Sequence, residues 1–126
     1  MAEVFRRVPC VTNVIENGSG WKTDNGADLI VTYSKGIPGY EEEETIVVQV
    51  KSYEGEMYTT KAVEDINNAL EKFEAYSGMI ITTADSTPAV EEAVKKLSAE
   101  LGKPVYLMAG QDTARFIMKY GIDLLS

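Results

Sequence analysis

Two short apolar stretches, residues 26–31 and 46–51, constrain the fold most, because each carries polar groups inside a strand-like pattern. The first holds one acid, Asp28, and the second holds Gln49 and Lys51 two positions apart. Side chains alternate along a strand, so Gln49 and Lys51 point to the same face and Val50 to the other. We predict that the two strands pair as a hairpin, which brings a carboxylate, an amide oxygen and an ammonium group together. Such a set can hold a divalent metal ion and a water molecule.

Asp28 has two interpretations, and both follow from the cost of placing a charge among apolar side chains. In the first, the carboxylate binds a metal ion together with Gln49. In the second, Lys51 forms an ion pair with Asp28 in a fold without activity. The residues by themselves leave both interpretations open.

The composition of the chain limits the kinds of catalytic and metal sites that it can form. Of 126 residues, 44% are hydrophobic and 25% are charged, so we expect one globular domain over residues 1–126. The chain has no histidine and one cysteine, which excludes histidine-dependent catalysis and the usual zinc sites, and any metal must be a hard ion with oxygen ligands. The single Cys10 suits a reducing cytoplasm. We find no signal peptide and no apolar run near the ~18 residues of a membrane span.

The net charge of −8 argues against nucleic acid as a partner, because phosphate binding needs Lys and Arg. The acids are unevenly placed, however, with four consecutive glutamates, Glu41–Glu44, which we interpret as a solvated loop tip. A local basic surface remains open, formed by Arg6, Arg7, Lys22, Lys35, Lys51 and Lys61.

The rest of the chain alternates between helical and strand patterns. Thr87-Pro88 is typical of a helix start, and Gly102 before Pro104 of a helix end. Helical spacing of apolar residues predicts an amphipathic helix after the hairpin, with Val63, Ile66, Leu70 and Phe73 on its buried side. In chain order we predict an edge strand within 8–15, the two hairpin strands, a helix over 61–77, a strand over 79–83, a helix over 88–101, a strand over 105–108 and a helix over 110–120.

This order predicts an α/β fold. An antiparallel hairpin that leads into right-handed β-α-β crossovers forms a mixed central sheet with helices on both faces.

The same residues resemble a known family. Gly26-Ala27-Asp28 followed by Gln49-x-Lys51 resembles the Mrr-like restriction endonuclease branch of the PD-(D/E)XK nuclease superfamily. The resemblance continues through residues 78–83, 88–93 and 107–112 and covers roughly residues 18 to 120. It implies a restriction endonuclease-like fold, whose order of strands and helices is the order that the periodicity predicts separately.

The resemblance also implies a site. Asp28, Gln49 and the Val50 carbonyl would ligate Mg²⁺ or Mn²⁺, and Lys51 would act on the attacking water. An amide at Gln49 removes one negative charge from the site, and the phosphate of the substrate would supply it.

Several other residues are weaker candidates for the metal site or for contact with DNA. Glu3 is the early acid that could join the metal site, because Mrr-like domains begin with a helix that carries a glutamate, although residues 1–7 are short for such a helix. Asp24 is either a second acid of the site or a turn-capping residue. We interpret Gln111 and Asp112 as helix-start residues and assign them no catalysis. Possible DNA contacts with equally plausible structural roles are Ser52, Tyr53, Tyr58 and Lys61.

The resemblance implies a metal-dependent DNA endonuclease of restriction type. Because nothing in the chain looks like a base-reading motif, we expect a separate DNA-recognition domain or subunit. Two alternatives stay open: a DNA-binding or assembly module with weak or no catalysis, and a nuclease that resolves four-way DNA junctions.

We also expect a symmetric homodimer, because cutting both strands of a duplex with one site per chain needs two sites related by a two-fold axis. Its candidate surface is the end of the chain, with Phe116, Met118, Leu124 and Leu125. The alternative is that these residues cover the sheet edge within one chain.

Overall fold

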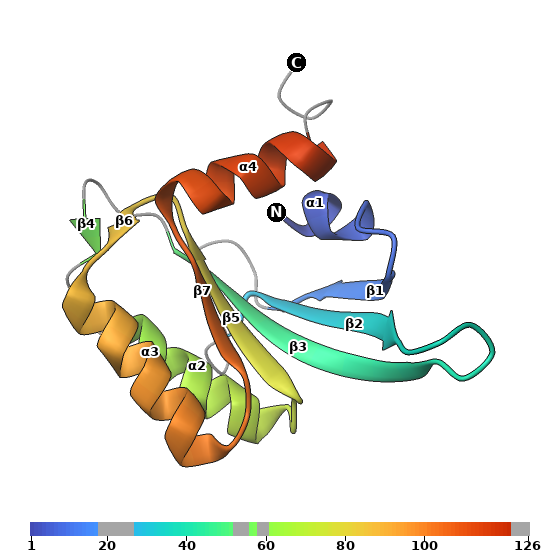
Figure 1. The fold of residues 1–126 in the computed structure, drawn as a ribbon, viewed down its shortest axis with the longest axis horizontal. Helices are drawn as coiled ribbons and strands as arrows, with labels where there is room; N and C mark the ends of the chain where they lie inside the picture. Colours follow the sequence, from blue (N-terminus) through green and yellow to red (C-terminus); the bar gives the residue numbers. More distant parts are fainter. Residues whose placement is uncertain (18–26, 52–55, 58–60, 122–126) are drawn as a thin grey trace.

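A mixed sheet lies at the centre of the computed structural model, which describes residues 1–17, 27–51, 56–57 and 61–121. Within these residues, five strands lie side by side in the order β1-β2-β3-β5-β7 (Figure 1). Their bounds are β1 Val11–Glu16, β2 Leu29–Lys35, β3 Glu42–Lys51, β5 Ser77–Thr82 and β7 Val105–Met108. β2 pairs antiparallel with β1 on one side and with β3 on the other, whereas β3, β5 and β7 are parallel. The predicted hairpin and crossovers are therefore confirmed.

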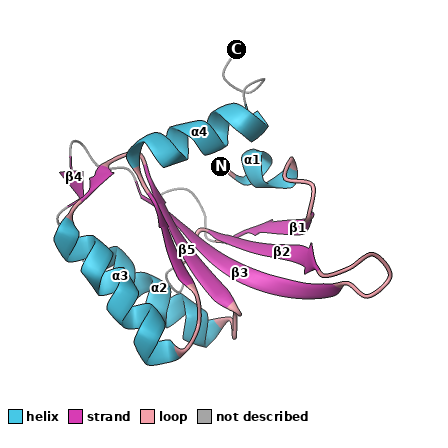
Figure 2. Ribbon diagram, in the orientation of Figure 1, coloured by secondary structure: helices cyan, strands magenta, loops and turns pink. Residues whose placement is uncertain are grey.

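Helices cover both faces of the sheet. α2 (Lys61–Lys72) and α3 (Pro88–Leu101) lie on one face, and α1 (Ala2–Arg6) and α4 (Gly110–Gly121) on the other (Figure 2). The described residues therefore form two hydrophobic cores, one on each face of the sheet. Because side chains alternate along β3, Val47 packs in the first core and Ile46 and Val48 pack in the second. The predicted α/β class with helices on both faces is confirmed.

α2 packs closely on the sheet. Its apolar stripe is buried as predicted, with Ile66 at 0% and Leu70 at 1% exposure. Gly78 on β5 permits this approach, since a Cβ atom there would lie 2.9 Å from Ile66 Cγ1. The helix ends at Lys72, earlier than the predicted residue 77, because β5 begins at Ser77.

The hairpin is longer than predicted. β3 begins at Glu42, so our interpretation of Glu41–Glu44 as a loop tip is wrong for three of the four glutamates. Cross-strand contacts explain the extension, because Tyr33 Oη donates a hydrogen bond to Glu44 Oε2 at 2.8 Å and Lys35 Nζ lies 3.6 Å from Glu44 Oε1. In Figure 1 the connection between β2 and β3 extends beyond the helices.

Two short elements were not predicted. β4 (Glu56–Met57) pairs in parallel with β6 (Asp85–Ser86) in a small second sheet. The N-terminal helix α1, by contrast, agrees with the sequence analysis, because it has five residues and is short. Among the described residues, we find no helix with the length and apolarity needed to cross a membrane.

Candidate functional site

Asp28 directly precedes β2, and hydrogen bonds from both neighbouring strands hold its backbone. Its N–H donates to the Val48 carbonyl at 2.9 Å, and its carbonyl accepts from the Asn17 N–H at 2.8 Å. The Asn17 side chain also donates to the Ala27 carbonyl at 2.9 Å. Asn17, which the sequence did not single out, thus fixes the segment that carries the acid.

The Asp28 carboxylate turns toward β3. Its Oδ2 atom accepts a hydrogen bond from the Val50 N–H at 2.7 Å. Asp28, immediately before the first hairpin strand, therefore lies against the backbone between Gln49 and Lys51, as the predicted hairpin requires. A charge-assisted hydrogen bond of this kind is stronger than one between neutral groups and fixes the carboxylate.

Gln49 and Lys51 lie on the same face of the sheet as Val47, which is the face that α2 covers. Gln49 is 0% exposed and is one of the largest fully buried side chains among the described residues. Lys51 ends β3, and its Nζ atom lies 3.6 Å from Asp65 Oδ2 on α2. Lys51 thus forms an ion pair with Asp65, whereas our second interpretation placed Lys51 with Asp28.

Asp65 is the site residue that sequence reasoning missed. It directly precedes Ile66, so helical spacing places it at the border of the buried stripe of α2. An acid at the border of the buried stripe can contact the sheet, and this was the signal in the sequence. The sequence does not show, however, which residue of the sheet Asp65 contacts.

The donor set suits a hard metal ion. A carboxylate from Asp28, an amide oxygen from Gln49 and the Val50 carbonyl are all oxygen ligands, which Mg²⁺ prefers. Among the described residues, no group of three or more His, Cys, Asp or Glu side chains could hold a metal ion. From the described residues, a metal here would take the Asp28 carboxylate, neutral oxygens, water and a substrate phosphate, a coordination that Mg²⁺ accepts.

Several other candidates lie elsewhere. Glu3 is on the exposed side of α1 and forms an ion pair with Arg6. Phe116 packs within the chain, with its ring centroid 5.2 Å from that of Phe5 and 5.5 Å from that of Tyr120. Asp24, Ser52, Tyr53, Tyr58, Leu124 and Leu125 lie outside the described residues, as does the side chain of Lys61.

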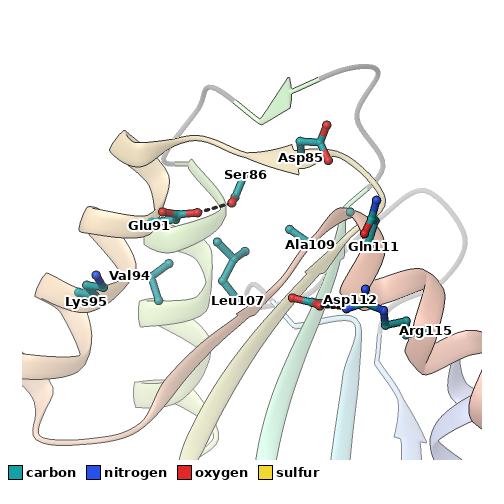
Figure 3. A pocket seen from close by; sticks show the side chains of 11 residues that line it. Asp85, Ser86, Glu91, Val94, Lys95, Leu107, Ala109, Gln111, Asp112 and Arg115 are labelled. Atoms are coloured by element: carbon teal, nitrogen blue, oxygen red, sulfur yellow. Dashed lines mark hydrogen bonds and ion pairs between the residues drawn. The ribbon is translucent and has the colours of Figure 1, made fainter.

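A separate cavity of about 660 Å³ lies where β7 leads into α4 (Figure 3). Asp28, Gln49 and Lys51, all in the described part of the chain, do not line it. Its wall mixes acids with two cations, and Asp112 already pairs with Arg115 at 3.4 Å. Gln111 and Asp112 are therefore wall residues of this cavity at the start of α4 and not part of the Asp28 site.

Comparisons with solved structures find proteins of the same fold. A complex of the MspJI restriction endonuclease with a 27-mer oligonucleotide has the same fold, with a TM-score of 0.61 and 22% sequence identity over 98% of this chain and 28% of that one. The DNA modification-dependent restriction endonuclease AspBHI gives a TM-score of 0.58 and 16% identity over 89% of this chain and 26% of that one. The chain thus spans about a quarter of the length of these two proteins. No curated protein sequence matches it.

The family comparison covers nearly the whole chain. The model of the Mrr catalytic domain, described as restriction endonuclease, matches residues 2–117. This range includes the hairpin, both crossovers and residues 110–117 of α4. The chain therefore belongs to the Mrr restriction endonuclease family.

Proposed function

We propose that this chain is the catalytic domain of a divalent-metal-dependent endonuclease that hydrolyses phosphodiester bonds in DNA. The observation that carries the proposal is the 2.7 Å hydrogen bond from the Val50 N–H to Asp28 Oδ2. It joins the acid that directly precedes β2 to the Gln49-x-Lys51 segment of β3, in a member of the restriction endonuclease family.

Each residue has a role in this proposal. Asp28 and Gln49, with the Val50 carbonyl, bind the ion, and the Val50 N–H orients the Asp28 carboxylate for this task. When bound, Mg²⁺ or Mn²⁺ polarises a phosphoryl oxygen and lowers the pKa of a water ligand. Lys51, as an ammonium group, holds the attacking water and stabilises negative charge on the phosphorus centre.

DNA is the proposed substrate. The MspJI structure contains an oligonucleotide, which supports nucleic acid as a ligand of this fold. The net charge of −8 predicts weak binding by this domain alone, so we propose that a separate DNA-recognition domain or subunit supplies sequence or modification specificity. We retain the proposals of a single nuclease domain over residues 1–126, a homodimer and a cytoplasmic location.

Substitution of Asp28 tests the function. Asp28→Ala should abolish Mg²⁺-dependent nicking of supercoiled plasmid, because it removes the proposed carboxylate ligand of the metal ion, while circular dichroism should show a folded protein. Asp112→Ala is the matched control, since it removes an exposed acid of the cavity by the α4 start. Wild-type nicking by the Asp28→Ala variant would refute the site assignment.

A non-catalytic DNA-binding or assembly module is the second candidate. The observations that favour it are the neutral Gln49 in place of an acid and the ion pair that Glu3 forms with Arg6. Absence of nicking by the wild-type chain in both Mg²⁺ and Mn²⁺ would support this candidate over the endonuclease.

A further inference from the structure

The ion pair between Lys51 and Asp65 differs from the surface ion pairs of the described residues. Its side chains are 27% and 22% exposed, whereas those of Lys96 and Glu100 are 76% and 61% exposed. Water and salt screen a shielded pair less than an exposed one. The contact can therefore restrict the orientation of the Lys51 ammonium group more than an exposed pair such as Lys96 and Glu100 can restrict its lysine.

Asp65 lies on α2, a helix that packs closely against the sheet. The next residue, Ile66, is 0% exposed and packs against Gly78 of β5, where the close approach leaves no room for a Cβ atom. Because this contact fixes α2 on the sheet, the Asp65 carboxylate has a defined position relative to the end of β3. A carboxylate on a fixed helix is suited to orient the long, flexible side chain of a lysine.

The backbone at Lys51 is held independently of Asp65. Lys51 is in register with Thr82 of β5. The Thr82 carbonyl accepts a hydrogen bond from Thr113 Oγ1 at 2.7 Å, and Thr82 Oγ1 accepts one from the Ala84 N–H at 3.1 Å. Loss of Asp65 would therefore act on the side chain of Lys51 while the strand keeps its place.

We propose that Asp65 is a positioning residue that holds the Lys51 ammonium group at the reacting phosphate. The inference rests on the proposed endonuclease function and deepens it. Asp65 touches neither substrate nor metal in this scheme, and it acts through Lys51. The aligned Lys51 then faces the ion held by Asp28 and Gln49.

Asp65→Asn tests the inference because it removes the charge with little change in shape. We expect kcat for plasmid nicking to fall by about 10- to 100-fold, as for other residues that orient a catalytic group. KM should stay within about twofold of the wild-type value, because Asp65 does not contact DNA in this scheme. Glu64→Gln is the matched control, since it removes the same charge from the neighbouring, exposed position of α2 and should leave kcat unchanged.

A second pair of variants keeps the test valid if Asp65→Asn fails to fold. Asp65→Glu and Asp65→Gln have the same length and differ in charge, so kcat should be about tenfold higher for the Glu variant. Equal kcat in these two variants, or an equal loss in Glu64→Gln, would overturn the positioning role while the endonuclease function stands. A wild-type chain that cuts no DNA would instead overturn the proposed function and this inference with it.

Discussion

At the scale of single residues, hydrogen bonds across the hairpin hold charged and phenolic groups in place at both ends of β3. At one end the Val50 N–H fixes Asp28. Toward the other end, burial and the neighbouring Glu44 carboxylate raise the pKa of Tyr33 to about 12 from the ordinary 10.0. The neutral Tyr33 hydroxyl donates to Glu44 Oε2, so losing the phenolic proton would both break this hydrogen bond and place two negative charges side by side.

The Tyr33 pKa predicts how stability depends on alkaline pH. Because the pKa is raised in the folded state, the Tyr33 contribution is fully present below pH 10 and is lost as the pH rises toward about 12. Tyr33→Phe should lower the free energy of unfolding by about 1 kcal/mol at pH 8, and this difference should shrink between pH 10 and 12. Urea unfolding at several pH values measures it, with Tyr40→Phe as a control at an 82% exposed tyrosine. A constant difference across this pH range would contradict the role of the Tyr33 hydroxyl.

At the scale of elements, the contact between α2 and β5 joins the helix that carries Asp65 to the sheet that carries Lys51. Gly78 is required there for space: an added Cβ would lie 2.9 Å from Ile66 Cγ1 and 3.4 Å from Leu70 Cδ1. Both helix side chains are fully buried, so they cannot move into solvent to make room.

Gly78→Ala should therefore destabilise the protein by about 1–3 kcal/mol through overpacking. In an Ile66→Ala background the same substitution should cost less, because the clashing side chain is gone. Urea unfolding of the four proteins of this cycle measures the difference. Costs that simply add would show that Gly78 does not act through Ile66.

At the scale of the whole molecule, charge is separated along the hairpin. β3 has ten residues from Glu42 to Lys51, so its glutamate-rich start lies roughly 30 Å from the lysine at its end. This distance is several times the Debye length of about 8 Å at physiological salt. The exposed glutamates therefore contribute to the net charge of −8 without acting on a phosphate held near Lys51.

Binding to a DNA duplex should be weak and salt-dependent, with a Kd of about 1–100 μM at physiological salt, as for non-specific contacts. Replacing the exposed Glu41, Glu42 and Glu43 with serine should change this Kd by less than about twofold, because salt screens them from the site. Fluorescence anisotropy with a labelled duplex at several salt concentrations measures both values. Tightening by tenfold or more would place the hairpin tip against the DNA.

The sequence by itself determined the order of the main strands and helices and the shared face of Gln49 and Lys51 on the second hairpin strand. These features are local: alternation along residues 46–51, the spacing of Val63, Ile66 and Leu70, and the Thr87-Pro88 and Gly102 signals for α3. Because backbone geometry enforces both periodicities, a single chain shows them without its partners. The same alternation placed Gln49 and Lys51 together and predicted that the hairpin would bring Asp28 to them.

The tertiary structure alone decided which side chains meet across elements. It paired Lys51 with Asp65, packed Phe116 against Phe5, and extended the hairpin so that Glu44 lies beside Tyr33 and Lys35. None of these contacts has a periodic signal, because each depends on how far one element is shifted and rotated against another. Packing at points such as Gly78 and Ile66 sets that shift, and it is a property of the assembled core and not of any one segment.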